Sequence, residues 1–176
     1  MNTEKNFTPN EHWMAEKYNE LNNTLFNGKL SDCAFGIFTT GKGSGGNTLG
    51  LFKITNKNIK ADRYTRKMFH LNYGNDKTYI NNDNFVTLCK PKIELNGNYH
   101  GTEHAFLCTL VHEMCHYYTY MYGWAPTQAH GKEFRNIGYA VASRSNGVFT
   151  IQRIATAEQM SELELNDEMK AKQEKR

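Results

Sequence analysis

A His-Glu-x-x-His motif, formed by His112, Glu113 and His116, carries the residue types that bind and use a catalytic metal ion. Residues four apart on an α-helix lie on nearly the same face, so the two imidazoles can converge on one ion. Glu113 lies about 100° around the helix from His112, which brings its carboxylate within reach of a water on the ion without making it a ligand. The motif therefore predicts a zinc site at which Glu113 acts as the general base.

A hydrolytic zinc site needs a third protein ligand and a free position for water. The best candidate is His130, which follows a turn at 123–126 and is predicted to lie in the first turn of the next helix. Gly131 beside it leaves room for a close approach of metal or substrate. Glu133 is the alternative third ligand, as in sites completed by a carboxylate. We favour His130 because it leads the helix and has the glycine beside it.

The motif is informative only if the segment around it is helical, because His-Glu-x-x-His also occurs by chance. Thr102 can cap a helix that runs to about Tyr122, and the turn at 123–126 ends it. Cys115, inside the motif, points away from the two histidines and is interpreted as a packed thiol. Apolar residues at helical spacing predict the buried face of this helix: Leu107, Leu110, Val111, Met114 and Tyr118.

The remaining elements predict an α+β fold with a small sheet of three or four strands. Thr8 as N-cap and Pro9 at the first helical position indicate a helix over 9–26. Short extended segments at 34–39, 49–54, 68–73 and 90–95 predict the strands, and Gly41–Gly46 is interpreted as a hairpin loop, not a phosphate loop. A third helix is predicted from about 127 to 146, followed by a short strand over 148–151.

One domain is predicted over 1–154, followed by a polar tail over 155–176 that can form a helix but has little to bury. The chain has 176 residues, 39% of them hydrophobic, which suits one domain with a core and excludes wholesale disorder. Its net charge of +3 is too small to indicate a polyanion partner by itself.

Composition also bears on the compartment. The N-terminus is polar and unlike a signal peptide, and no apolar run approaches the roughly 18 residues of a membrane span. The four cysteines form no CxxC pair, and we interpret them as reduced thiols: Cys33, Cys89, Cys108 and Cys115. These features predict a cytoplasmic protein without a membrane partner.

Four segments, in this order and spacing, resemble the SprT-like metallopeptidase domain of the Spartan DNA–protein crosslink proteases and bacterial SprT proteins: Leu25–Leu30, Ile93–Leu95, Leu107–His116 and His130–Phe134. The resemblance implies a compact zincin-like domain, in which an N-terminal helix and a small sheet support the His-Glu-x-x-His helix and the next helix carries the third ligand.

The resemblance further implies one zinc ion held by His112, His116 and His130, with Glu113 as the catalytic base. It implies a protein substrate that is crosslinked to DNA or sits on it, and therefore an enzyme in the cytoplasm, at the nucleoid or in a nucleus. The chain departs from many such proteins because no cysteine follows Cys115, so a C-terminal zinc ribbon is not encoded here.

One basic segment could supply DNA contacts in place of that module. Six basic residues gather there with Tyr64 and Phe69 between or beside them, a pattern typical of a groove for single-stranded nucleic acid: Lys53, Lys57, Lys60, Arg63, Arg66 and Lys67. The alternative, which we favour, is a solvated irregular loop.

Three functions are consistent with these patterns. The first is a zinc endopeptidase that acts on DNA-associated proteins, and the second is a zinc peptidase with another substrate. The third is a zinc-containing nucleic-acid-binding module without protease activity. Glu113 argues against the third, because a structural ion needs no base beside an open position.

Overall fold

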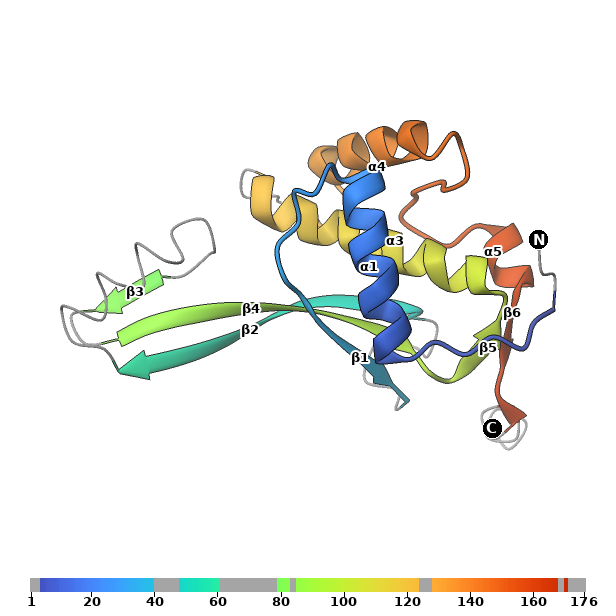
Figure 1. The fold of residues 1–176 in the computed structure, drawn as a ribbon, viewed down its shortest axis with the longest axis horizontal. Helices are drawn as coiled ribbons and strands as arrows, with labels where there is room; N and C mark the ends of the chain where they lie inside the picture. Colours follow the sequence, from blue (N-terminus) through green and yellow to red (C-terminus); the bar gives the residue numbers. More distant parts are fainter. Residues whose placement is uncertain are drawn as a thin grey trace.

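The computed structural model describes residues 4–39, 48–60, 79–82, 85–123, 128–167 and 170, with the backbone alone described at 55–60, 79–82 and 85–89. It is an α+β fold in which helices cover one face of a twisted sheet (Figure 1). The described helices are α1 (Glu11–Leu25), α3 (Glu103–Tyr122), α4 (Lys132–Arg144) and α5 (Ala157–Ser161). The described strands are β1 (Ala34–Phe38), β2 (Gly50–Lys60), β3 (Tyr79–Asn82), β4 (Phe85–Asn96), β5 (Tyr99–Gly101) and β6 (Leu163–Leu165).

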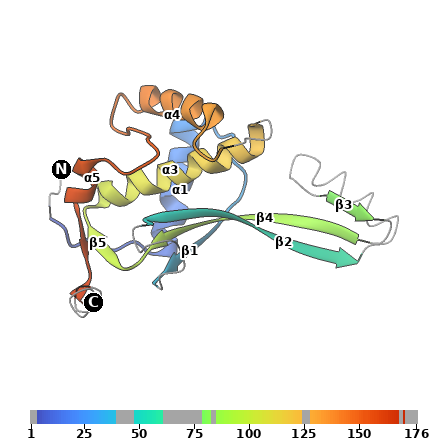
Figure 2. The ribbon, with the colours of Figure 1, turned by 180° about the vertical axis from the view of Figure 1, so that it is seen from behind.

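The main sheet is built on β4, which pairs in parallel with β1 and antiparallel with β2 and β3. The β2–β4 ribbon continues well beyond the helices, a feature that is clear from the front and from behind (Figures 1 and 2). The strands predicted at 49–54 and 90–95 are therefore parts of longer ones. The Gly41–Gly46 segment and the strand predicted at 68–73 lie outside the described residues. The hairpin interpretation is nevertheless wrong, because β1 and β2 both pair with β4 and not with each other.

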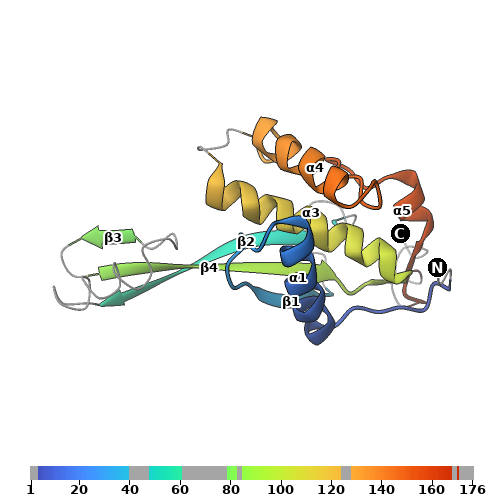
Figure 3. The ribbon, with the colours of Figure 1, turned by 45° about the horizontal axis from the view of Figure 1, so that its top comes forward.

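The core lies between this sheet and α3. Ile93 and Leu95 of β4 are fully buried, and so are Leu110 and Met114 of α3. Residues two apart on a strand point to the same face, and residues four apart on a helix do so too, so these two faces meet in the core. Above α3, on the side away from the sheet, lies α4, while α1 runs along one side from α4 to β1 (Figures 1 and 3). Helix α3 is thus covered by the sheet on one face and by α4 on another.

The helix ends follow local capping chemistry. The Asn10 side chain accepts a hydrogen bond from the Trp13 backbone N–H at 2.8 Å, so α1 begins at Glu11 and the prediction of Thr8 as its N-cap is wrong. The helix ends where Gly28 adopts a φ of 70° and donates its N–H to the Asn22 carbonyl. Thr102 caps α3, as predicted, by accepting from the Ala105 N–H at 3.2 Å.

The C-terminal segment packs onto the domain. Strand β6 pairs antiparallel with β5, and Leu163 is buried. The Thr102 backbone N–H donates to the Glu162 carbonyl at 3.0 Å, and the Thr102 hydroxyl to the Glu162 carboxylate at 2.9 Å. The expectation that residues after 155 have little to bury is therefore wrong for this segment. The strand predicted at 148–151 is also wrong, because these residues are irregular and Phe149 is buried without a strand partner.

Two further expectations concern thiols and membranes. Cys33, Cys108 and Cys115 are free, and the Cys89 side chain lies outside the described part of the chain. Burial raises the pKa of the Cys33 and Cys108 thiols to about 12 and also raises the pKa of the fully buried Cys115 thiol.

None of the helices in the described ranges is both long enough and apolar enough to cross a bilayer.

Candidate metal centre

Three imidazoles converge at the junction of α3 and α4. The Nε2 atom of His116 lies 3.2 Å from Nε2 of His112 and 3.1 Å from Nε2 of His130. The Nε2 atoms of His112 and His130 are 3.3 Å apart. His112 and His116 are one turn apart on α3, and His130 lies in the turn that precedes α4. Within the described residues, this is the one group of three or more His, Cys, Asp or Glu side chains close enough to share a metal ion.

The turn before α4 positions His130. The helix begins at Lys132 with Gly131 as N-cap, so the prediction that His130 lies in the first helical turn is wrong by two residues. A Cβ on Gly131 would lie 3.1 Å from the Gln128 carbonyl oxygen, to which the Gly131 N–H donates. The absence of a side chain at Gly131 therefore lets the turn close, and this explains the glycine without reference to a metal or substrate. Glu133, the alternative third ligand, is not part of the converging group, and the geometry favours His130.

The spacing and the charge state of the three nitrogens both fit a metal ion. Nitrogen ligands about 2.0–2.1 Å from a tetrahedral zinc ion lie roughly 3.3 Å from one another.

The three histidines are also held in their neutral form. Burial lowers the pKa of His112 to about 4; the charge of His130 lowers it further, and a hydrogen bond with the Gln152 backbone partly opposes this effect. Burial and the two neighbouring histidines lower that of His116 to about 3. Burial, followed by the charge of Arg153, also lowers the pKa of His130. Neutral imidazoles are the form that binds metal.

Phe134 of α4 fixes the positions of the three rings. Its ring centroid lies 5.1 Å from that of His112, 4.5 Å from that of His116 and 4.8 Å from that of His130. Phe134 is buried, so it forms an apolar wall behind the cluster. The helix predicted from about 127 to 146 includes Phe134, but spacing along one helix cannot tell which residues of another element its side chains meet.

The Glu113 side chain packs against β2. Its side chain is 6% exposed, and burial raises its pKa to about 8, an effect partly offset by a hydrogen bond with the Phe52 backbone. A Cβ on Gly50 would lie 3.1 Å from the Glu113 Oε1 atom. The carboxyl group is therefore held in a closely packed site, and Glu113 directly follows His112 on the same helix.

Nothing in the sequence indicates a role for Gln152 or Arg153. The Gln152 backbone hydrogen-bonds His112, and the Arg153 charge acts on His130. A backbone hydrogen bond to a ligating imidazole, such as the one from Gln152, orients the ring and favours one tautomer. Residues 150–153 belong to an irregular segment after α4, and no motif marks them.

The predicted nucleic-acid segment is described only in part. Lys53 forms an ion pair with Glu94, which is 9% exposed and also lies 3.8 Å from the Lys92 ammonium. Lys57 and Lys60 lie in the part of β2 of which only the backbone is described. Arg63, Arg66 and Lys67 lie outside the described residues. The Lys53 charge is therefore already partly neutralised, which weakens its assignment to a nucleic-acid groove.

Comparison with protein families matches residues 14–158 of this chain to the SprT-like family. A comparison with curated proteins and one with solved structures each gave no significant match. The matched residues run from α1 to α5 and include the three converging histidines and Glu113.

Proposed function

The chain belongs to the SprT-like family, and from this premise we propose that it is a zinc-dependent endopeptidase that hydrolyses peptide bonds with water. The observation that carries the proposal is the convergence of three imidazole Nε2 atoms within 3.3 Å of one another. The buried Glu113 beside them supports a catalytic site over a structural one, since a structural ion needs no base.

In this mechanism His112, His116 and His130 hold the ion, and Phe134 keeps their rings in place. A zinc ion bound there supplies Lewis-acid chemistry, which acidifies water and polarises a carbonyl group. Glu113 takes the proton from the attacking water and passes it to the leaving amine. A cation nearby favours the ionised carboxylate and so opposes the effect of burial on the Glu113 pKa, which leaves this group able to accept and return a proton near neutral pH.

The test is the Glu113→Gln variant, which keeps the shape of the side chain and removes the base. We expect peptide cleavage to fall by at least about a hundredfold, because general-base catalysis contributes that much or more. Zinc content by elemental analysis and the circular dichroism spectrum should stay unchanged. Glu133→Gln is the matched control: it lies outside the histidine cluster and should keep its activity. Full peptide cleavage by Glu113→Gln would mean that Glu113 is not the general base.

We further propose that the substrates are proteins crosslinked to DNA or bound on it, and that the enzyme acts where DNA is found, in the cytoplasm, at the nucleoid or in a nucleus. Family membership and the basic segment support this part. Reversal of Arg63, Arg66 and Lys67 to Glu should lower affinity for single-stranded DNA and flatten its dependence on salt. Lys53→Glu should matter less for DNA binding, because Lys53 pairs with Glu94.

A second candidate function is a zinc-containing nucleic-acid-binding module without protease activity. It is distinguished by measuring DNA binding and cleavage on the same zinc-loaded preparation. Salt-dependent DNA binding by a protein that cleaves no peptide or protein, with or without single-stranded DNA, would favour the module. Cleavage without DNA binding would favour a peptidase with another substrate.

A further inference from the structure

A pocket of about 450 Å³ opens beside the metal centre, between α4 and the segment at 150–153. His130 lines one end of it, and its interior is formed by Phe134, Gly138 and Ile151. A Cβ on Gly138 would lie 3.1 Å from Cβ of Ile151, so the glycine lets the segment pack closely on the helix. The volume lies within the range of pockets that bury a small ligand or side chain.

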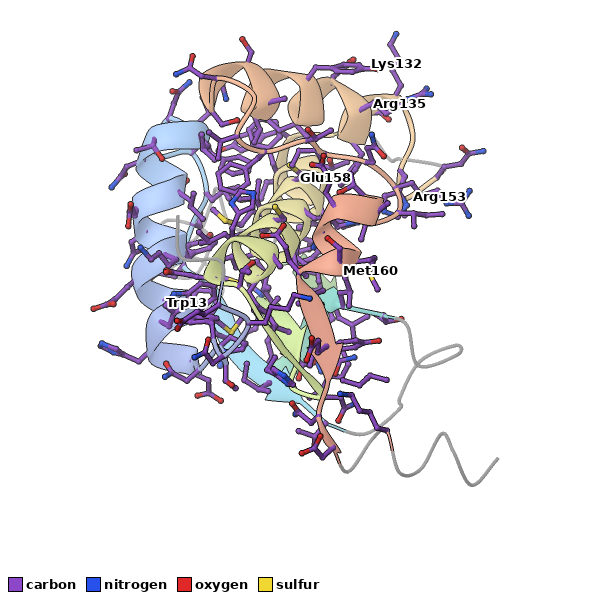
Figure 4. The ribbon with its side chains drawn as sticks, turned by 90° about the vertical axis from the view of Figure 1, so that its right-hand side faces the viewer. Trp13, Lys132, Arg135, Arg153, Glu158 and Met160 are labelled. Atoms are coloured by element: carbon purple, nitrogen blue, oxygen red, sulfur yellow. The ribbon has the colours of Figure 1, made fainter. Side chains whose placement is uncertain are left out.

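Two arginines from opposite walls also line this pocket. Arg135 lies on α4 and Arg153 on the facing segment, and no acidic residue is among the lining residues. Figure 4 shows both side chains on the same side of the molecule, together with Lys132. Glu158 lies on that side too (Figure 4), but in the part of the chain that the structure describes, no ion pair joins it to either guanidinium.

Arg135 and Arg153 are exposed and form no ion pair with a carboxylate among the described residues, and Arg153 is near enough to act on His130. An arginine presents planar donors that match a carboxylate, and the pairing is strong where two such bonds form. The apolar interior would accept the methylene groups of a side chain whose charged end meets the arginines at the rim.

We propose that this pocket binds an acidic side chain of the substrate protein, glutamate in preference to aspartate, at a position flanking the scissile bond. The inference rests on the proposed peptidase function, because the place of the bond is set by the metal centre that His130 shares with the pocket. A phosphate backbone fits less well, since it has no apolar stem to lie against the apolar part of the lining, which includes Phe134 and Ile151.

The experiment measures binding separately from cleavage. The zinc-loaded Glu113→Gln protein is titrated into fluorescent peptides with amidated C-termini that differ only in one residue, Glu, Gln or Lys. We expect the Glu peptide to bind about fivefold to tenfold more tightly than the Gln peptide, which is the gain of a charge-assisted hydrogen bond over a neutral one. The amidated ends exclude a contribution from a terminal carboxylate.

Charge reversal then assigns the preference to the pocket. With Arg135→Glu and Arg153→Glu added together, the order should reverse, so that the Lys peptide binds more tightly than the Glu peptide. Lys132→Glu is the matched control, because it makes the same charge change on the same helix at a residue that does not line the pocket. The single variants Arg135→Gln and Arg153→Gln should each reduce the preference, and they cover the case in which the double variant does not fold.

Three results would overturn the proposal. One is an equal affinity of the Glu113→Gln protein for Glu and Gln peptides. Another is an equal loss of preference in Lys132→Glu and in the arginine variants. The third is an unchanged Glu preference in arginine variants that lose affinity for a single-stranded oligonucleotide, which would make this a nucleic-acid site. Failure of the wild-type protein to cleave any peptide would instead count against the proposed function, since the binding arm does not depend on cleavage.

Discussion

Glu113 packs against Gly50, and this contact limits where its carboxylate can lie. A Cβ at Gly50 would stand 2.7 Å from the Thr109 Cγ2 atom and 3.1 Å from Glu113 Oε1. We therefore expect Gly50→Ala to displace the carboxyl group and to lower cleavage about tenfold or more, because small misplacements of a catalytic group are costly. Zinc binding should persist, since the three histidines lie elsewhere on α3 and before α4.

Gly36→Ala is the control for that variant. Its added Cβ would approach the flexible end of the Lys92 side chain at 2.9 Å, and this end can move aside. Cleavage by Gly36→Ala should stay within about twofold of the wild-type rate. Unchanged cleavage in Gly50→Ala would mean that Glu113 tolerates displacement and that its contact with β2 has no part in the reaction.

The candidate site divides into residues that a sequence can indicate and residues that it cannot. His112, Glu113 and His116 are related by helical periodicity, which is local and therefore visible in the sequence. His130 was found because it follows a short turn and because one further ligand was needed. Phe134 and the backbone of Gln152 contact the histidines only through the packing of α4 and of the irregular segment after it. No periodicity connects Gln152 to α3.

At the scale of elements, the β5–β6 pair fastens the C-terminal segment to the start of α3. A Cβ at Gly101 would overlap the Glu162 carbonyl oxygen and stand 2.9 Å from the Leu163 side chain. Gly101→Ala should therefore separate β6 from β5 and lower the free energy of unfolding by about 2 kcal/mol. Urea unfolding followed by circular dichroism measures this loss.

Glu164→Ala tests whether that loss is specific to the close contact. Glu164 lies on β6, next to Leu163, but its ion pairs with Lys5 and His100 are at the surface, and its side chain is 44% exposed. Such pairs are worth about 0–1 kcal/mol, so the variant should unfold close to the wild-type midpoint. A loss in Gly101→Ala as small as the one expected for Glu164→Ala would show that the added Cβ is accommodated and that β6 does not depend on Gly101.

The elements themselves were predicted unevenly, for physical reasons. The helices were found because apolar residues recur every three to four positions, and their ends were missed by a few residues because Thr8 and Asn10 are both good caps. The outer part of β2 was missed because Asn56, Lys57 and Asn58 have low strand propensity. Pairing with β4 over eleven residues decides its conformation. The pairing of β6 was not visible either, since its partner lies more than sixty residues earlier.

At the scale of the whole molecule, α3 belongs to both the core and the metal centre. Its buried residues pack on the sheet, while its histidines meet His130 at the junction with α4. A metal ion that binds the folded chain and not the unfolded chain adds to stability by mass action. Removal of zinc with a chelator at pH 7 should therefore lower the melting temperature, and stoichiometric zinc should restore it. An unchanged melting temperature with zinc fully removed would argue against metal binding by the folded state.

The metal-free protein should also respond to pH in a way that reports the two kinds of buried group. The pKa values of His112 and His116, about 4 and about 3, lie below the ordinary value of 6.5. As the pH falls below 6.5, the unfolded chain takes up protons before the folded chain does, so stability present above 6.5 is lost toward pH 4. Glu113 acts in the opposite direction: its pKa of about 8 lies above the ordinary 4.5, so it adds stability as the pH falls from 8 to 4.5.

The Glu113→Gln variant separates these two effects in chelated protein. The histidine contribution is common to both proteins, so the difference in unfolding free energy between wild type and variant isolates the Glu113 carboxyl group. This difference should shift in favour of the wild type by roughly 1 kcal/mol for each pH unit between 8 and 5. Urea unfolding at pH 5, 6, 7 and 8 measures it. A difference that stays constant over this range would mean that the Glu113 carboxyl group titrates alike in the folded and unfolded chains. Its packing between α3 and β2 would then not be the cause of a raised pKa.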